Sequence, residues 1–470
     1  MMPQLEDVLG KVLTKIKPTE DERAQAMSIY ENIKKIVETY LSIPYDFKVE
    51  LHGSVAKGTE LRGDIDLDVF VLIRYDEISR GWLEKSVVQP LFEVLKRFYG
   101  NVRLNYATHP YIHVDLGVFE VDIVPAYWAR DISEIRTAVD RTPFHTKYVI
   151  SKLSEGSKDE VRLLKAFFKG VGIYGAEIKT EGFSGYLTEL LIVKYGKFLK
   201  ALEAMTSWRA GEVVIVDEDK IKENCSYLRK AFRSPLIVPD PVDPRRNAAS
   251  AVSLETLAKA VLASHIFLLE PSREFFILER EMIHKEDIER FATAVKESGR
   301  EAVGIVFRVS GDIAPEVIWG KLKSTARSFM NYVRKSGFTV ISYAVWSDET
   351  SEAAILVTVQ PRELAPYELH LGPPLGKVSD LKAFVAKYRL DAESFGPYVT
   401  PDGRIFTLRR RKNVLLYQLA EEYVSTLKGE SNFLVSRILK DLSEVYEFVV
   451  SRGDPELVKA FKKAAILDLK

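Results

Sequence analysis

The chain reads HGSVAKGTELRGDIDLDVFVLI from His52 to Ile73. This stretch follows a strand-like run, Phe47 to Leu51, and ends in an apolar run from Leu67 to Ile73 that predicts a buried strand. Gly53 and Ser54 lie where the first strand gives way to a turn. Because glycine has no side chain, backbone N–H groups and the serine hydroxyl can approach a phosphate closely there. The stretch therefore predicts a phosphate-binding turn between two strands.

Two carboxylates begin the apolar strand. Asp66 and Asp68 are separated by one residue, and the two-residue period of a strand puts both on the same face. Such a pair repels unless cations bridge it, and hard oxygen ligands that share a site with substrate phosphates favour Mg²⁺. A third carboxylate is expected from a neighbouring strand. Asp122 is the candidate, because it is flanked by Val121 and Ile123 in a run otherwise suited to burial.

The same acids allow other interpretations than a magnesium site. Asp64 shares the strand parity, so Asp64 and Asp66 could form the pair, but Asp64 directly follows a glycine inside the turn. The acids could also form a solvated turn, with Asp122 as a satisfied edge residue. His109 and His113 suggest a zinc site, yet the better-placed carboxylates favour magnesium.

Length and composition limit the class of protein. The 470 residues suffice for two to four domains, and 46% hydrophobic residues supply ample core. Lys+Arg and Asp+Glu number 67 each, so any contact with nucleic acid needs a local basic surface. The single cysteine, Cys225, excludes an internal disulfide and a cysteine-based zinc cluster. No stretch approaches the ~20 apolar residues of a membrane span, and we expect a cytoplasmic protein without membrane contact.

The pattern along the chain predicts an α+β multidomain protein. A catalytic head is expected over residues 1–141, where helical and strand-like runs alternate; its elements are a helix at 20–41, strands at 47–51, 67–73, 103–106 and 119–124, and a helix at 83–99. A mainly helical neck is expected over residues 142–270, because helical periodicity runs through 158–200 and 253–269. The proline-rich loop at 238–250 interrupts this neck.

The C-terminal part predicts a second mixture of helices and strands. A strand at 302–309, a helix at 315–335 and strands at 339–346 and 353–360 have the β-α-β-β order of a ferredoxin-like module. We expect this module as a tail over residues 311–399. Residues 271–310 and 400–470 are expected to form an α/β body, with a hairpin at 400–412 and final helices.

The stretch from His52 to Ile73 resembles the nucleotidyltransferase superfamily that includes DNA polymerase beta, poly(A) polymerases and CCA-adding enzymes. Four further stretches are similar to the archaeal, class I CCA-adding enzymes; they are His109 to Tyr127, Ala138 to Val149, Glu160 to Gly196 and Pro241 to Ser250. The resemblance is dense as far as Ser250. Beyond Pro271 it rests on element order and the sequence LGPP from Leu371 to Pro374. It implies a polymerase-beta-like head, a helical neck, an α/β body and a ferredoxin-like tail.

The resemblance also implies roles for individual residues. It makes Asp66, Asp68 and Asp122 the catalytic acids and the metal ligands. Asp66 departs from many relatives, which have glutamate there. The residues that would contact the nucleotide are Gly53, Ser54, Lys57, Thr142, His145, Lys165, Tyr174 and Arg246, of which Ser54 and Lys57 would bind the triphosphate. Because Lys57 is often arginine in relatives, a bidentate contact is lost here.

Taken alone, several of these residues leave another interpretation open. Lys165 lies with Arg162 and Lys169 opposite the apolar stripe, where a solvated face is the commoner outcome. His145 lies in an expected turn and could be a surface histidine. Tyr174 follows two glycines and could pack at a helix end, and Arg246 could be simply exposed. The basic run from Arg409 to Lys412 could contact tRNA phosphates or end a solvated hairpin.

The implied reaction is template-independent addition of C, C and A to the 3′ end of tRNA, with CTP and ATP as substrates, pyrophosphate as product and Mg²⁺ as cofactor. The expected partners are the acceptor and T-stem minihelix of tRNA and a second copy of the chain in a homodimer. Another terminal transferase, such as a poly(A) polymerase or an oligoadenylate-synthase-like enzyme, would share the same acids. A catalytically inactive RNA-binding scaffold is the alternative from another class.

Overall fold

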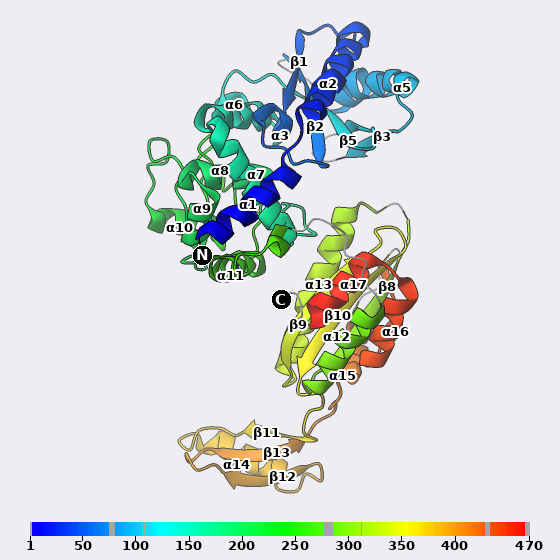
Figure 1. Ribbon diagram of the computed structural model, residues 1–470. Coiled ribbons are helices and arrows are strands. Elements are labelled where there is room, and N and C mark those ends of the chain that lie inside the picture. The colour runs from blue at the N-terminus through cyan, green and yellow to red at the C-terminus, as the bar shows by residue number, and fades with distance from the viewer. Residues whose placement is uncertain are drawn as a thin grey trace. The chain divides into compact units, whose positions relative to one another are not determined.

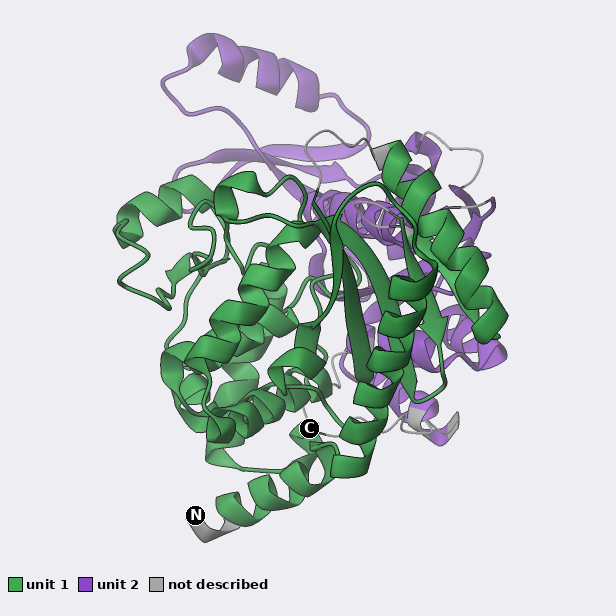
Figure 2. Cartoon of the chain, turned by 90° about the horizontal axis from the view of Figure 1, so that it is seen from above, with its two compact units in different colours: residues 1–279 green, residues 280–470 purple. Residues whose placement is uncertain are grey.

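The computed structural model describes residues 2–74, 80–106, 110–276, 285–311, 313–427 and 433–465. The chain divides into two compact units, residues 1–279 and 280–470 (Figure 2). The expected head and neck both fall in the first unit, and the expected tail and body fall in the second, except for residues 271–279 of the expected body. His109 lies outside the described residues. In the part of the chain that the structure describes, no helix is both long and apolar enough to cross a membrane.

The head is built on a five-stranded sheet. Its order is β1-β2-β5-β4-β3; the strands are β1 (Phe47–His52), β2 (Ile65–Ile73), β3 (Val102–Tyr106), β4 (Pro110–Asp115) and β5 (Phe119–Tyr127). Strands β2 and β5 are parallel, and the other neighbours are antiparallel. Helices α2 (Glu20–Tyr40) and α5 (Gln89–Phe98) cover one face, where the apolar residues of the strands are buried (Figure 1). The opposite face of β2 and β5 carries the acids.

Two details of the head differ from the sequence prediction. The helix expected at 83–99 is divided into α4 (Arg80–Leu83), a π-helical turn (Glu84–Val88) and α5. Strand β4 was not predicted, although its residues alternate between buried and half-buried positions. It begins at Pro110, which cannot donate a hydrogen bond to the ladder.

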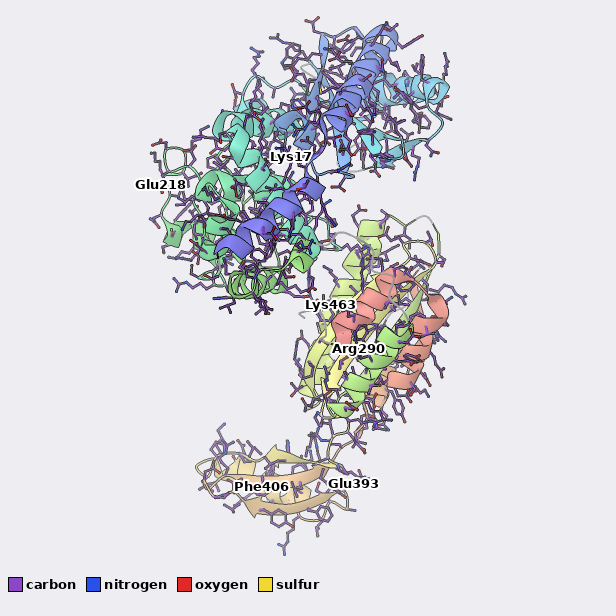
Figure 3. The ribbon with its side chains drawn as sticks, in the orientation of Figure 1. Lys17, Glu218, Arg290, Glu393, Phe406 and Lys463 are labelled. Atoms are coloured by element: carbon purple, nitrogen blue, oxygen red, sulfur yellow. The ribbon has the colours of Figure 1, made fainter. Side chains whose placement is uncertain are left out.

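The N-terminal helix α1 (Met2–Ile16) belongs to the neck, which corrects the expected head over 1–141. Val8, Val12 and Ile16 recur every four residues, and this stripe is buried with the apolar residues of α7 (Glu155–Gly170). Lys17 lies just after the helix (Figure 3). Its ammonium group binds the Asp159 carboxylate at 2.7 Å. The chain therefore starts in the neck, crosses to the head after Lys17 and returns at α6.

The neck is mainly helical, as expected. Besides α1 and α7, its helices are α6 (Thr142–Lys152), α8 (Gly185–Tyr195), α9 (Phe198–Met205), α10 (Cys225–Phe232) and α11 (Leu254–Leu269). Ser154, Ser184 and Ser253 begin α7, α8 and α11 by accepting a backbone N–H. A short pair of strands, β6 (Glu212–Val213) and β7 (Leu236–Ile237), lies beside the proline-rich loop. In the core the rings of Phe167, Phe198 and Phe267 pack edge to face.

The second unit contains the expected β-α-β-β order, extended by a further helix and strand. Its elements are β8 (Glu301–Val309), α13 (Pro315–Lys335), β9 (Thr339–Ser347), β10 (Glu352–Gln360), α15 (Leu416–Thr426) and β14 (Phe433–Leu439). The antiparallel sheet has the order β14-β8-β10-β9, which makes the module ferredoxin-like. Helices α13 and α15 cover one face. The other face is covered by α12 (Lys285–Glu297), α16 (Leu442–Arg452) and α17 (Pro455–Ala465).

The tail is shorter than the expected 311–399 and is an insertion between β10 and α15. It contains β11 (Tyr367–Leu371), α14 (Val378–Tyr388), β12 (Ser394–Val399) and β13 (Ile405–Arg410), with the sheet order β11-β13-β12. The expected boundary at 311 differs because β10 hydrogen-bonds with β8 and β9 with β10, all in one sheet. The ferredoxin-like module is therefore the body. Where the insertion leaves and rejoins it, the Leu364 N–H donates to the Val414 carbonyl at 2.9 Å.

Candidate functional site

The three predicted acids lie on two adjacent parallel strands. Asp68 on β2 stands directly beside Asp122 on β5, and Asp66 stands beside Glu120. All four alternate with buried apolar residues, so their side chains leave the core face of the sheet. Asp64 precedes β2 and forms an ion pair with Lys169, which removes it from the pair that starts the strand.

Crowding changes the acidity of these carboxyl groups. Burial, together with the neighbouring Asp122, raises the pKa of Asp68 to about 6. Burial and the nearby Asp64 raise the pKa of Asp66 to about 6 as well, and burial raises that of Asp122. The cause is the cost of bringing negative charges together out of water. A cation at this face would relieve that cost, so the donor set suits a hard divalent ion.

Gly53 allows the phosphate-binding turn to lie against Asp68. Strand β1 ends at His52, which pairs with Asp68 across the sheet, and the short helix α3 (Gly53–Lys57) begins immediately after it. Gly53 has φ +67°, and a Cβ atom placed there would lie 1.7 Å from Asp68 Oδ2. Only glycine satisfies both constraints. The first turn of α3, which carries Ser54, is thus held next to the acids.

Lys57 and Lys165 meet at a buried glutamate that the sequence analysis did not single out. Glu189 on α8 accepts a hydrogen bond from the Lys57 ammonium group at 2.5 Å and one from the Thr59 hydroxyl at 2.6 Å. Lys165 Nζ lies 3.7 Å from the same carboxylate and donates to the Thr59 carbonyl at 3.1 Å. Lys165 and Arg162 are both buried, so the solvated-face interpretation of this cluster is wrong.

A histidine on the neighbouring strand β4 lies within hydrogen-bond distance of Asp122. His113 lies opposite Asp122 in the antiparallel pair of β4 and β5, and its Nδ1 is 2.8 Å from Asp122 Oδ1. From the sequence alone, His113 was a candidate only for a zinc site. The alternation of Ile112 and Val114 with polar residues could have revealed the strand that positions it.

His145 and Arg246 converge on a second buried acid, Asp240. His145 Nε2 lies 2.8 Å from Asp240 Oδ2, and the Tyr186 hydroxyl donates to Oδ1 at 2.8 Å. The His145 and Tyr186 rings stack, with centroids 3.9 Å apart. Arg246 Nη1 lies 3.7 Å from Asp240, and its side chain is 40% exposed. His145 is therefore an ordered part of the neck, while Arg246 keeps a face open to a ligand.

The remaining predicted residues lie around these two clusters. Thr142 is the first residue of α6, and Tyr174 is half-buried next to Lys169, whose ammonium group is 5.2 Å from the ring centre. Burial raises the pKa of Tyr174, so its hydroxyl stays protonated. A Cβ atom on Gly185 would lie 3.0 Å from that hydroxyl. Tyr174 thus packs closely at the start of α8, which agrees with the packing interpretation and still leaves its hydroxyl near Lys165.

The basic run of the tail is compensated within its own unit. Arg409 and Arg411 both form ion pairs with Glu368. Arg410 Nη1 lies 3.9 Å from the Glu393 carboxylate, and Lys412 Nζ lies 2.6 Å from that of Glu422. Contact of these side chains with phosphates would therefore compete with existing ion pairs.

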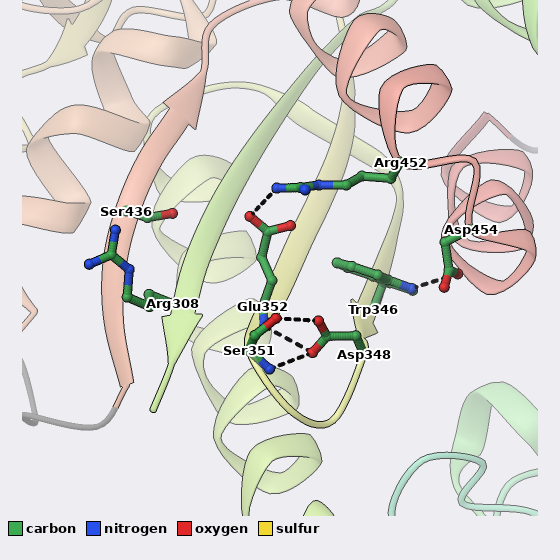
Figure 4. Close-up of a pocket in the computed structure, with 8 residues that line it drawn as sticks. All are labelled: Arg308, Trp346, Asp348, Ser351, Glu352, Ser436, Arg452 and Asp454. Carbon is green, nitrogen blue, oxygen red and sulfur yellow. Dashed lines mark hydrogen bonds and ion pairs between the residues drawn. The ribbon is translucent and has the colours of Figure 1, made fainter. Parts of the chain in front are cut away.

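A separate recess of about 280 Å³ lies in the second unit, where the turn between α16 and α17 meets the β9–β10 turn (Figure 4). Trp346 Nε1 donates to Asp454 at 3.0 Å, and Arg452 forms an ion pair with Glu352 at 2.7 Å. Several of its polar side chains thus pair with one another, and the residues that line it include none of the predicted site residues.

Three family models match successive parts of the chain. They are described as "Nucleotidyltransferase domain" for residues 31–145, "tRNA nucleotidyltransferase, second domain" for 159–277 and "CCA-adding enzyme, C-terminal domain" for 298–448. The "CCA-adding enzyme" of Pyrobaculum islandicum is 35% identical over 442 residues, which cover 92% of this chain and 96% of that protein. The chain belongs to the CCA-adding enzyme family.

Other members of the CCA-adding enzyme family are similarly close. The proteins of that name from Saccharolobus shibatae and Sulfolobus acidocaldarius are 37% and 34% identical; the matches cover 88% and 94% of this chain and 91% and 97% of those proteins. Among solved structures, the chain resembles "Structure of E. coli MS115-1 CdnC + ATP" with a TM-score of 0.43 and 19% identity over 58% of this chain and 94% of that chain. At this TM-score and identity, the resemblance says nothing about the site of this CCA-adding enzyme.

Proposed function

We propose that Asp66, Asp68 and Asp122 carry out template-independent addition of C, C and A to the 3′ end of tRNA. The activity itself follows from family membership, since the chain matches almost the whole length of the CCA-adding enzymes. The substrates are tRNA, CTP and ATP, and pyrophosphate leaves. The observation that supports the assignment to these acids is their common face, with Asp68 and Asp122 side by side on parallel strands.

Nucleotidyltransferases use divalent metal ions, and we propose Mg²⁺ for this chain. All three acids would hold one ion, and Asp66 and Asp68 would hold a second. When bound, such ions lower the pKa of the attacking hydroxyl and neutralise the triphosphate. In the described residues no three acidic, histidine or cysteine side chains converge on one point. Phosphate oxygens would complete the coordination, as is common for magnesium.

The other residues would bind and orient the nucleotide. The Gly53 backbone and the Ser54 hydroxyl face the α-to-γ phosphates, and Lys57 and Lys165 supply positive charge. Asp122, whose Oδ1 lies 2.8 Å from His113 Nδ1, would accept the proton of the tRNA hydroxyl.

The Asp240 cluster would contact the sugar and base. His145, Thr142 and Tyr174 contact the nucleotide, and Arg246 with the loop at 241–250 contacts the base edge. With no template strand, these protein groups and the growing RNA end must choose between CTP and ATP in a single pocket.

The tRNA partner would be recognised by shape. We propose that the second unit binds the acceptor and T-stem minihelix through its phosphates and grooves, as proteins generally recognise double-stranded RNA. We also propose that the chain acts as a homodimer in the cytoplasm, where its tRNA substrate is found.

The test supplies tRNA lacking its last three residues with one nucleotide at a time. We expect CTP alone to add two residues, ATP alone to add none, and both together to stop at three. A run of A residues would indicate a poly(A) polymerase instead. Asp66→Ala, Asp68→Ala and Asp122→Ala should each abolish C and A addition alike while tRNA binding remains. A variant that still adds A would contradict the single site.

A further inference from the structure

Glu189 is a charged side chain placed where water cannot reach it. It lies on α8 of the neck and is fully buried. Its three partners come from two sides: Lys57 and Thr59 follow the phosphate-binding turn of the head, and Lys165 lies on α7 of the neck. A carboxylate buried in this way is stable only when its partners satisfy it. Here the partners keep it ionised, since the two lysines lower the pKa of Glu189 against the effect of burial.

The network is unbalanced in charge. Two ammonium groups face one carboxylate, so the cluster carries one net positive charge. Both lysines act on the neighbouring acid as well, because each lowers the pKa of Asp68. The cluster therefore lies within electrostatic reach of the site, and its spare charge favours an anion there.

We propose that Glu189 is a positioning residue that holds Lys57 and Lys165 in place and competes with the nucleotide triphosphate and with pyrophosphate for their ammonium groups. The proposal rests on the proposed function, because it takes the two lysines as triphosphate ligands. An ammonium group has three N–H donors, so Lys57 can keep one bond to Glu189 while it turns others to a phosphate. Phosphate binding then has to overcome the attraction of the buried carboxylate. That competition weakens the hold on pyrophosphate and speeds its release.

Glu189→Gln separates this role from a structural one. The amide keeps the shape and an acceptor oxygen for Lys57 or Thr59, but it removes the negative charge. The two ammonium groups then lack their nearest counter-ion until an anion binds. We expect pyrophosphate and CTP to bind about tenfold more tightly, with a lower KM for CTP and a lower kcat because pyrophosphate leaves slowly. A merely structural defect would weaken binding instead.

The experiment measures pyrophosphate binding by calorimetry and CTP addition by steady-state kinetics, on the full chain with Mg²⁺. Glu160→Gln is the matched control, because Glu160 on α7 is a neck acid that accepts only a backbone N–H outside the site, that of Phe198 at 2.8 Å; it should leave both measurements unchanged. Glu189→Asp keeps the charge but shortens its reach, so it should tighten pyrophosphate binding by a smaller factor. If the glutamine variant does not fold, this variant alone decides.

Equal or weaker pyrophosphate binding in the folded glutamine variant, or in the aspartate variant when only that one folds, overturns the proposal. Lys57→Ala and Lys165→Ala separate this failure from failure of the proposed function. If both alanine variants bind pyrophosphate more weakly while the Glu189 variants do not differ from the parent, only the competition is wrong. If the alanine variants bind pyrophosphate as the parent does, the lysines are not phosphate ligands and both proposals fall.

Discussion

Gly53 shows how closely the turn and the acids are packed. A methyl group there would overlap Asp68 Oδ2, at 1.7 Å from its Cβ. We expect Gly53→Ala to lower single-turnover C addition at least a hundredfold, because either the turn or Asp68 must move. Gly63→Ala is the control. Gly63 has φ +72°, and a Cβ atom placed there would meet no neighbour within 4 Å, so this variant tests only the backbone cost of ~1–2 kcal/mol. Equal activity of the two variants would contradict the argument.

The raised pKa values of Asp66 and Asp68 predict a dependence of stability on pH. A carboxyl group whose pKa rises on folding favours the folded state below its unfolded pKa, about 3.9, and that contribution is lost as the pH rises through the folded value of about 6. With divalent metal ions removed by a chelator, the Asp68→Asn variant should therefore unfold at a higher temperature than the parent at pH 8. The difference in unfolding temperature should shrink towards pH 5. Mg²⁺ should stabilise the parent more than the variant. A difference that grows as the pH falls would contradict the assignment.

Arg246 and its neighbour Arg245 offer a matched pair. Arg246 lies by Asp240, whereas Arg245 is 80% exposed and pairs with Asp243. Arg246→Ala should reduce the ratio of correct to incorrect incorporation roughly ten- to a hundredfold, ~1.4–2.8 kcal/mol, because a base edge loses its partner. The readout is single-turnover addition of each nucleotide to tRNA ending before its last A. Arg245→Ala should keep the ratio, and equal slowing with all nucleotides in Arg246→Ala would show a role in loop geometry.

At this scale, local pattern predicted the acids and the turn, and tertiary contacts decided the rest. Asp66 and Asp68 carry their own signal, since strand period and neighbouring glycine are local. Glu189 has none: its partner Lys57 is 132 positions away, and α8 reads as an ordinary apolar helix around it. Asp240 likewise acquires meaning only when α6 brings His145 to it. Roles of single residues remain predictions until the variants are measured.

Among the elements, α1 depends on its apolar stripe. Val12 is buried in the neck core, whereas Lys15 on the same helix is exposed. Val12→Ala removes two methyl groups and should lower the stability of the first unit by ~1.6 kcal/mol, at ~0.8 kcal/mol for each group removed. Lys15→Ala should change it by less than ~0.5 kcal/mol. Urea unfolding followed by a probe in the neck checks this, and equal midpoints would place α1 outside the core.

Elements with strong periodicity were predicted well. Strands β1, β2, β5, β8, β9 and β10 and helices α2 and α13 lie where the sequence placed them. The hairpin at 400–412 is present, but its first strand starts earlier, at Ser394. Strand β4, which is as long as β1, was missed because it begins at a proline, and helix α1 was missed because charged residues are mixed into its apolar stripe. Periodicity located strands that are almost fully buried, such as β8 and β10, as well as the half-buried β1.

On the scale of the whole molecule, the tail is separable. Its two ends meet, since the Arg411 N–H donates to the Pro366 carbonyl at 2.7 Å. Replacing residues 367–410 with a short Gly-Ser linker should leave the ferredoxin-like sheet folded and CTP binding unchanged. Affinity for tRNA should fall at least tenfold at a fixed salt concentration. The same linker inserted in the exposed turn after Asp402 serves as the control. Unchanged tRNA affinity after the deletion would exclude the tail from tRNA binding.

The sequence predicted four parts, whereas the structure divides into two compact units with other boundaries. Composition changes mark the passage from strands to helices near residue 141, but no local signal shows that β10 pairs with both β8 and β9. The element order β-α-β-β was right, and its assignment to the tail was not, because an inserted sheet separates β10 from the helix and strand that complete the fold. An insertion is hard to detect from sequence, because the two segments of the interrupted domain are separated in the chain and each resembles the start of a separate domain.

The placement of α1 in the neck has a consequence for synthesis. This helix leaves the ribosome before its partner α7, which follows only after about 140 further residues, on the order of ten seconds at 5–20 residues per second. An isolated helix of this length is marginally stable, so its apolar side is without a partner during that time. The head, whose main cluster of buried apolar residues lies between positions 26 and 123, can fold meanwhile. Because α7 is synthesised so much later, α1 is expected to pack into the first unit only after the head has folded.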